Sequence, residues 1–300
     1  DHGPLVERGL RLKKIGSRIL STLGGREIHP VSVAVGGFYR APSAVDVRAL
    51  VDDLHWALDA AIETVRVTGR LEFPDFTPDY EFVALQHPDE YALNEGRVVS
   101  NRGVNIDAPD YEDTFVEVQV PHSNALHSVI KGRASYLVGP MARFSLNFGQ
   151  LPAVAREAAR EASLPVPCRN PFQSIVVRAV ELVFACAEAL RIIDAYEPPS
   201  EPRREVANRP GVGHAFTEAP RGLLYHRYAI DERGLILDAK IVPPTSQNQR
   251  RIEEDLRELA PQLVTQPLDA ATLRCEQAVR NYDPCISCAT HFLKLHIDRQ

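Results

Sequence analysis

The chain has 300 residues and a formal net charge of −6, with 44% hydrophobic and 25% charged residues. These proportions are ordinary for a globular protein that can bury a sizeable apolar core. No basic stripe or run of Lys and Arg occurs, which argues against nucleic acid as a partner.

The most apolar stretch and the cysteines narrow the class of protein further. Arg178, Glu181, Glu188 and Arg191 interrupt FQSIVVRAVELVFACAEALRIIDAY, so we expect a core helix there and no membrane span. The cysteines are few, odd in number and uneven in spacing: Cys168, Cys186, Cys275, Cys285 and Cys288. This pattern favours a reducing compartment and a metal or redox role over a disulfide framework.

In the first part of the chain, apolar periodicity predicts helices over 5–23 and 44–68, with a short strand between them. Ser43 is placed to act as the N-cap of the second helix. From 71 to 121 the segments are broken by proline and alternate with period two, which predicts a small β region.

The rest of the chain is expected to be largely helical. Helices are predicted over 124–133, 151–163, 172–195, 246–260 and 268–281. A hairpin with strands over 221–230 and 235–243 interrupts them and turns at 231–234. Because no linker is evident, we predict one domain over 1–300, mainly α with small β insertions.

The predicted hairpin register places Arg221 opposite Pro244 and Pro220 opposite Thr245. Arg221 and Thr245 would then meet at one end of the hairpin, as catalytic pockets require of polar groups. Each residue also has a structural interpretation. Arg221 fits a surface ion pair, and Thr245 fits the N-terminal region of the next helix.

The segment DPCISCATH near the end of the sequence is the strongest chemical motif. Asp283 fits an N-cap with Pro284 at the first helical position, which puts Cys285 and Cys288 on one face of the first turn. Thiolates are favoured at a helix N-terminus and bind soft metals. His291 lies one turn further along.

Spacing alone leaves the occupant of this motif open. Zinc is the commonest metal at such pairs and would need a fourth ligand, for which Cys275 is a candidate. A redox dithiol is the other alternative, although such pairs usually follow a strand in a βαβ unit. The spacing favours metal over redox chemistry without naming the metal.

DPCISCATH resembles the C-terminal signature of the large, catalytic subunit of nickel–iron hydrogenases. Four further segments resemble the same family in the same order: HPVSVAVGGFYRAP, YLVGPMARFSLN, EAPRGLLYH and VPPTSQN. Of these, YLVGPMARFSLN is similar to the cytoplasmic, bidirectional branch of the family. The resemblance extends from about residue 28 to residue 291. It implies the hydrogenase large-subunit fold, with central long helices and peripheral β hairpins.

The resemblance also implies roles for metal-binding residues. Cys285 and Cys288 would be thiolate ligands of nickel, one terminal and one bridging to an iron that carries CO and CN ligands. His291 would bind a separate Mg²⁺ or Fe²⁺ near the end of the mature chain.

Other residues would form the pocket around the metals. Arg221 would overhang the open metal position, with Asp283 supporting it. Pro220, together with the Pro244–Thr245 element, would shape the pocket of the diatomic ligands, and Thr245 would donate a hydrogen bond to a cyanide.

The implied activity is the reversible heterolytic cleavage of H₂ in the cytoplasm. The guanidinium of Arg221 or a thiolate sulfur would accept the proton. Electrons would pass to an iron–sulfur small subunit, since the chain has too few cysteines for clusters. Further subunits that reduce NAD(P) or a deazaflavin are expected.

One departure from the family pattern concerns the remaining nickel ligands. The family uses a second pair, R-x-C-x-x-C, and no cysteine precedes Cys168. We therefore expect a C-terminal fragment that is inactive alone. The alternatives are a metal-free scaffold like the quinone-site subunit of complex I, a zinc-binding protein, or an inactive truncated product.

Overall fold

The computed structural model describes residues 3–285, which fall into two compact units. The first unit holds 3–70, 152–162 and 179–209, and the second holds 71–151, 163–178 and 210–285. The expected single domain over 1–300 stays a prediction. Among the described helices, none combines the length and the apolar character that crossing a bilayer requires.

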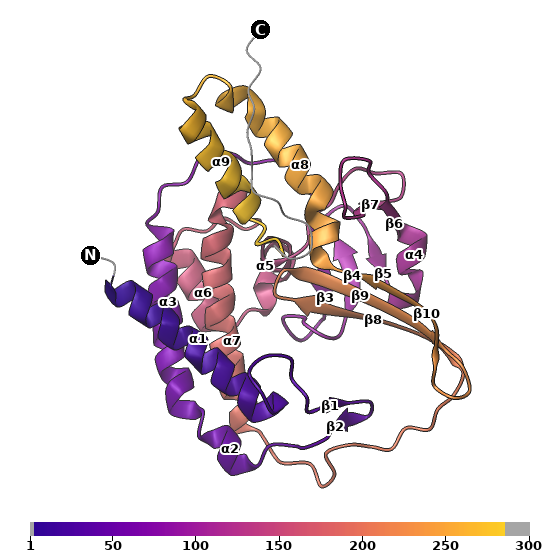
Figure 1. The fold of residues 1–300 in the computed structure, drawn as a ribbon. Coiled ribbons are helices and arrows are strands. Elements are labelled where there is room, and N and C mark those ends of the chain that lie inside the picture. The colour runs from indigo at the N-terminus through magenta and orange to yellow at the C-terminus, as the bar shows by residue number, and fades with distance from the viewer. Residues whose placement is uncertain (1–2, 286–300) are drawn as a thin grey trace. The chain divides into compact units, whose positions relative to one another are not determined.

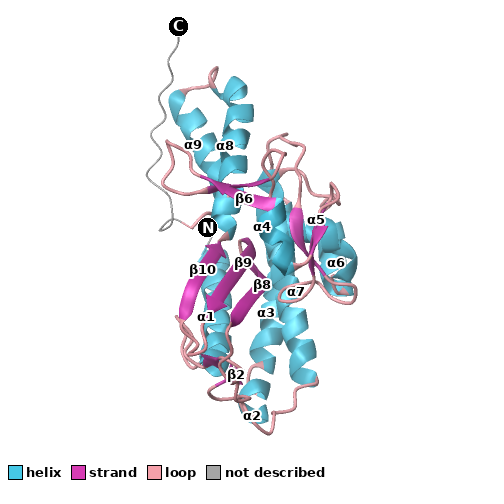
Figure 2. Cartoon of the chain, turned by 90° about the vertical axis from the view of Figure 1, so that its right-hand side faces the viewer, coloured by secondary structure: helices cyan, strands magenta, loops and turns pink. Residues whose placement is uncertain are grey.

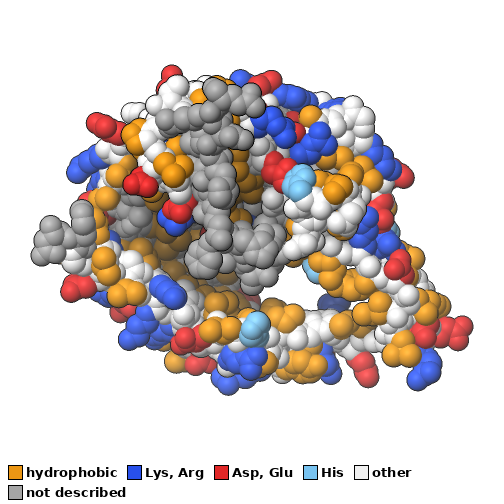
Figure 3. All heavy atoms as spheres, turned by 45° about the horizontal axis from the view of Figure 1, so that its top comes forward, with side chains coloured by type: hydrophobic (Ala, Val, Ile, Leu, Met, Phe, Trp, Pro, Cys, Tyr) orange, Lys and Arg blue, Asp and Glu red, His pale blue; other side chains and the backbone are white. Residues whose placement is uncertain are grey.

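Charged side chains of both signs are interspersed over the face of the described chain that Figure 3 shows, with apolar side chains among them. Alternation of this kind prevents a strong field of one sign from building up over that face.

The first unit consists of helices and one small hairpin (Figure 1). Its elements, of which the last begins in the second unit, are α1 (Gly3–Gly24), β1 (Val33–Ala34), β2 (Gly37–Phe38), α2 (Ala44–Arg48), α3 (Val51–Gly69), α6 (Ala153–Glu161) and α7 (Ser174–Asp194). α3 packs against both α1 and α6. Buried Ile15, Ala57 and Cys186 join α1, α3 and α7 in one apolar cluster.

The predicted cap at Ser43 is present, but the helix after it is divided. The Ser43 hydroxyl accepts a hydrogen bond from the Asp46 N–H at 3.1 Å, and the Asp46 carboxylate accepts one from the Ser43 N–H at 3.2 Å. The N–H of Ala49 then closes α2 on the carbonyls of Val45 and Val47. Two helices, α2 and α3, therefore replace the single helix predicted over 44–68.

The second unit combines three small antiparallel sheets with helices. Its sheets have the strand orders β3-β4-β5, β6-β7 and β10-β9-β8. Its elements are β3 (Val83–Gln86), β4 (Arg97–Ser100), β5 (Asn105–Ile106), α4 (Tyr111–Thr114), β6 (Phe115–Val118), β7 (His127–Ile130), α5 (Pro140–Asn147), β8 (Gly211–Ala219), β9 (Gly222–Ile230), β10 (Ile236–Val242), α8 (Pro244–Leu263) and α9 (Leu268–Arg280). α8 and α9 lie side by side, as both ribbon views show (Figures 1 and 2).

The elements of this unit that differ from the prediction include β7, α5 and β8. The helix expected over 124–133 is wrong, because His127–Ile130 pairs with β6 as strand β7 and is buried at all four positions. α5 and β8 were not predicted. α5 is only two turns long, and β8 is an edge strand whose Gly211 and Gly213 weaken any strand pattern.

The hairpin register also differs from the prediction. β9 pairs Tyr225 with Val242, and β10 has a bulge between Ile236 and Asp238 that shifts the alignment. On the other side of β9, Ala219 pairs with Gly222. Pro220 and Arg221 therefore form the two-residue turn between β8 and β9 and do not face Pro244 and Thr245.

Two glycines let this turn approach the start of α5. A Cβ atom on Gly139 would lie 2.6 Å from the carbonyl oxygen of Arg221, and one on Gly222 would lie 2.6 Å from a methyl group of Val138. Both glycines have positive φ, +111° and +138°. Only glycine meets both conditions without strain, so these two positions fix the place of the Pro220–Arg221 turn.

We expect Gly222→Ala to lower the free energy of unfolding by about 2–4 kcal/mol, from backbone strain and overpacking. Gly213→Ala is the matched control, because a Cβ atom there meets nothing within 4 Å. It should stay within about 1 kcal/mol of the parent chain. Urea unfolding followed by circular dichroism compares them, and equal midpoints would contradict the packing argument.

Candidate metal and catalytic site

The segment after α9 is anchored before it reaches the cysteine motif. The carbonyl oxygen of Asn281 accepts hydrogen bonds from the Ser174 hydroxyl at 2.8 Å and from the Arg178 guanidinium at 2.7 Å. Asp283 then adopts φ +47°, a turn conformation that Asp tolerates better than most residues. An N-cap is usually extended, so Asp283 departs from its predicted cap geometry. The helix predicted after it lies outside the described residues.

Tyr282 is held by a buried network on α8. Its hydroxyl donates to Asp255 Oδ2 at 2.6 Å, and the Tyr80 hydroxyl donates to the same oxygen at 2.7 Å. The Arg251 guanidinium donates to Asp255 Oδ1 at 2.8 Å. Burial raises the pKa of both tyrosines well above the usual value, so they remain donors at neutral pH. The network fixes the residue immediately before Asp283.

Arg221 reaches this anchored segment from the β8–β9 turn. Its Nε donates to the carbonyl oxygen of Asp283 at 2.5 Å and lies 3.2 Å from the Asp283 carboxylate. Arg221 also lines a small cavity of about 10 Å³ with Met141, Asn248 and Tyr282. A cavity of this size holds about one water molecule or a diatomic gas molecule. The structure thus brings two of the predicted site residues together.

Arg143 on α5 holds the turn that carries Arg221. Its guanidinium donates to Glu218 Oε2 at 2.9 Å, to the carbonyl of Ala219 at 2.8 Å and to that of Pro220 at 3.0 Å. Both charged side chains are buried. Sequence reasoning did not select Arg143, although an arginine within the apolar segment YLVGPMARFSLN was a usable signal.

Thr245 approaches the motif from the first turn of α8, where Pro244 is the first helical residue. Its hydroxyl oxygen accepts a hydrogen bond from the Cys285 N–H at 3.4 Å. The Asn248 side chain holds this end of α8 by bonding the N–H and the carbonyl of Val138, at 2.9 and 3.1 Å. Thr245 and Arg221 therefore contact the same short segment, although they are not cross-strand partners.

The cysteines separate into two chemical groups. Burial raises the pKa of Cys168 to about 12 and that of Cys186 to about 11, and it also raises the pKa of Cys275. These three are neutral thiols of the core, and Cys275 packs in an apolar cluster between α8 and α9. Cys285 is only half-buried. Cys288 and His291 lie outside the described residues.

Comparison with known proteins identifies what this arrangement is similar to. Residues 98–291 match the family described as nickel-dependent hydrogenase. The chain is 30% identical over 294 residues to sulfhydrogenase 1 subunit alpha of Pyrococcus furiosus, covering 97% of this chain and 68% of that protein. It is 26% identical over 324 residues to the NAD-reducing hydrogenase HoxS subunit beta of Cupriavidus necator, covering 96% and 66%.

The fold gives the same result. An NAD⁺-reducing [NiFe]-hydrogenase crystallised in its H₂-reduced state superposes with a TM-score of 0.86 at 25% identity, covering 97% of this chain and 70% of that one. The predicted fold class, mainly α with small β insertions in the hydrogenase large-subunit fold, is confirmed. The matches favour a catalytic hydrogenase subunit over a metal-free complex I scaffold or a zinc protein.

We expect Arg143→Met to destabilise the protein by about 3–5 kcal/mol, because it leaves the buried Glu218 carboxylate without its countercharge. Adding Glu218→Gln should recover part of this loss of stability. Glu218 Oε1 accepts a hydrogen bond from the Leu85 N–H at 2.9 Å, and the amide oxygen of Gln can still accept it. Urea unfolding of both variants measures the effect. A double variant no more stable than the single one would contradict the explanation by an unpaired charge.

Proposed function

Because the chain belongs to the nickel-dependent hydrogenase family, we propose that it forms the catalytic subunit of a nickel–iron hydrogenase that cleaves and produces H₂. The family implies a nickel–iron centre. The observation that carries the proposal is the convergence of Arg221, Asp283 and Thr245 around the backbone that leads to Cys285. A half-buried thiol two residues after the residue that Arg221 contacts is a donor group suited to a soft metal.

We propose that Cys285 and Cys288 hold the nickel, and that CO and CN ligands complete the iron. When bound, the centre supplies an open coordination position at which H₂ is polarised. Pro220 and Pro244 would line the pocket of the diatomic ligands, and Thr245 would donate its hydroxyl proton there. The Cys285 N–H donates to the oxygen of that hydroxyl, which leaves its hydrogen free to point elsewhere.

Arg221 acts in this proposal as a fixed positive charge and a hydrogen-bond donor. A guanidinium keeps its proton in proteins, so of the two proton acceptors considered, a thiolate sulfur is the better one. Asp283 accepts from the Nε edge of the guanidinium through both its carbonyl and its carboxylate. The Arg221 side chain also lines the small cavity beside this segment. His291 would bind the separate Mg²⁺ or Fe²⁺.

Electrons must leave through another chain. An iron–sulfur cluster takes about four thiolates, and Cys168, Cys186 and Cys275 are buried as neutral thiols. We therefore propose an iron–sulfur small subunit as partner, with further subunits that reduce NAD(P) or a deazaflavin. A cytoplasmic location would suit these acceptors.

We expect Arg221→Lys to reduce H₂-dependent reduction of a viologen dye by at least about 100-fold in the assembled enzyme, because the ammonium group cannot reproduce the guanidinium fork. Nickel content and unfolding midpoint should not change. The control is Arg227→Lys on the following strand, β9, where the arginine pairs with Glu112 and Asp238 away from the turn. Activity retained in Arg221→Lys would remove the proposed role.

A second experiment distinguishes a nickel ligand from a structural zinc ligand. Cys285→Ser should abolish stoichiometric nickel and H₂ oxidation in the assembled enzyme while leaving the unfolding midpoint nearly unchanged, because the side chain is half-buried. Cys275→Ala should do the opposite, losing stability from the apolar cluster but keeping nickel. Metal analysis and thermal unfolding of both variants report this. Unfolding of Cys285→Ser with loss of zinc would contradict the proposal.

A further inference from the structure

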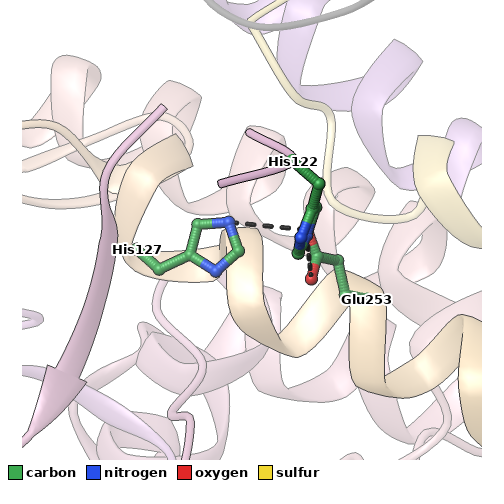
Figure 4. Close-up of side chains that lie close together, drawn as sticks. All are labelled: His122, His127 and Glu253. Atoms are coloured by element: carbon green, nitrogen blue, oxygen red, sulfur yellow. Dashed lines mark hydrogen bonds and ion pairs between the residues drawn. The ribbon is translucent and has the colours of Figure 1, made fainter. Parts of the chain in front are cut away.

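A second group of metal-binding side chains lies away from the cysteine motif. His122, His127 and Glu253 point toward one another (Figure 4), and their ligand atoms all lie within 4.8 Å of one another. His122 Nε2 is 3.1 Å from Glu253 Oε1 and 3.2 Å from Oε2, and His127 Nε2 is 3.4 Å from Oε1. Two imidazole nitrogens and one carboxylate form the donor set of many zinc sites.

The fold brings these three residues together from two elements. His127 is the first residue of β7, and His122 lies in the loop that joins β6 to β7. The Ser123 side chain braces this loop by bonding the carbonyl and the N–H of Ala125, at 3.0 and 3.1 Å. α8 packs against β7 and supplies Glu253. His122 in the loop and Glu253 on the helix are 131 positions apart in the sequence, so only the fold brings them together.

The Nε2 atom of His127 is a buried polar atom without a hydrogen-bond partner. The His127 side chain is 4% exposed, yet its Nε2 atom makes no hydrogen bond. A buried polar atom without a partner is costly and rare in folded proteins, so it points to a missing group. Burial lowers the pKa of His127, as do His122 and Arg250, whereas Glu253 raises it. The neutral imidazole that results is the form that binds metal ions.

We propose that His122, His127 and Glu253 bind one Zn²⁺ ion, with water as the fourth ligand. Tetrahedral zinc with bonds of about 2.0–2.1 Å places its ligand atoms about 3.3 Å apart, close to the 3.1 Å between His122 and Glu253 and the 3.4 Å between His127 and Glu253. The ligand nitrogens of the two histidines lie within 4.8 Å of each other. A simple ion pair would satisfy His122 and Glu253 but would leave the buried His127 Nε2, which is 3.4 Å from Glu253 Oε1, without a hydrogen bond. His122 is 65% exposed, so water reaches the fourth position from its side.

The ion would tie the β6–β7 loop to α8. Glu253 lies about two helical turns after Thr245, so the clamp acts on the same rigid helix that brings Thr245 to the cysteine motif. It would stabilise the second unit by binding the folded state alone. The site contains no sulfur and does not depend on the hydrogenase chemistry.

The test uses the 300-residue chain with Cys285 and Cys288 both replaced by Ser, which removes the thiolate pair as a zinc ligand. Titration with zinc chloride against a chromophoric chelator should find one zinc per chain, and zinc X-ray absorption should show nitrogen and oxygen neighbours only. Zinc should also raise the unfolding temperature.

His122→Gln and Glu253→Gln should each weaken zinc binding by at least about tenfold and remove the rise in unfolding temperature. His122 is exposed, so its variant should fold even if a change at the buried His127 does not. His87→Gln is the control, since His87 lies in another loop, where its Nδ1 accepts a hydrogen bond from the Asp89 N–H. Zinc binding that is unchanged in His122→Gln and Glu253→Gln, or that requires sulfur, would overturn the proposal.

Discussion

The backbone contact between the start of α5 and the β8–β9 turn is the constraint on which the site depends. Gly139 and Gly222 allow this contact because a Cβ atom on either would collide with the facing segment. The contact brings Arg143 within reach of the carbonyls of the turn, and their hydrogen bonds then fix the direction in which Arg221 leaves it. The Arg221 side chain is thus placed by groups on α5 and by the backbone of its own turn.

Long helices were predictable because apolar periodicity over many residues records which face is buried. Short elements were not, because tertiary contacts decide them. Strand β7 is buried at every position between β6 and α8, so its sequence lacks the alternation of a half-exposed strand. β8 contains Gly211 and Gly213 and is defined by pairing with β9. Its omission also displaced Arg221, which the prediction placed in a strand and not in a turn.

The site also contains residues that the sequence predicted and supporting residues that it did not. The family resemblance was enough to predict that Arg221, Asp283 and Cys285 belong to one region, and the structure brings the first two into contact. The supporting groups escaped prediction because buried polar residues resemble surface residues in composition. PTSQNQRRIEEDL at the start of α8 is strongly polar, yet most of its residues are buried. Asn248 bonds to Val138 and Asp255 accepts from Tyr80, and each of these partners lies more than a hundred residues away.

The residues that stabilise this region differ from those proposed to act on H₂. Arg221 and Asp283 are 41% and 49% exposed, and an ion pair in that setting contributes about 0–1 kcal/mol. The charge pair therefore cannot hold the geometry by itself. The buried groups around Asp255 and Arg143 hold it from either side, and their removal leaves unpaired charges in the core. A guanidinium that contributes little to folding can donate hydrogen bonds to a molecule in the cavity that it lines. The proposed role of Arg221 in electrostatic catalysis requires this.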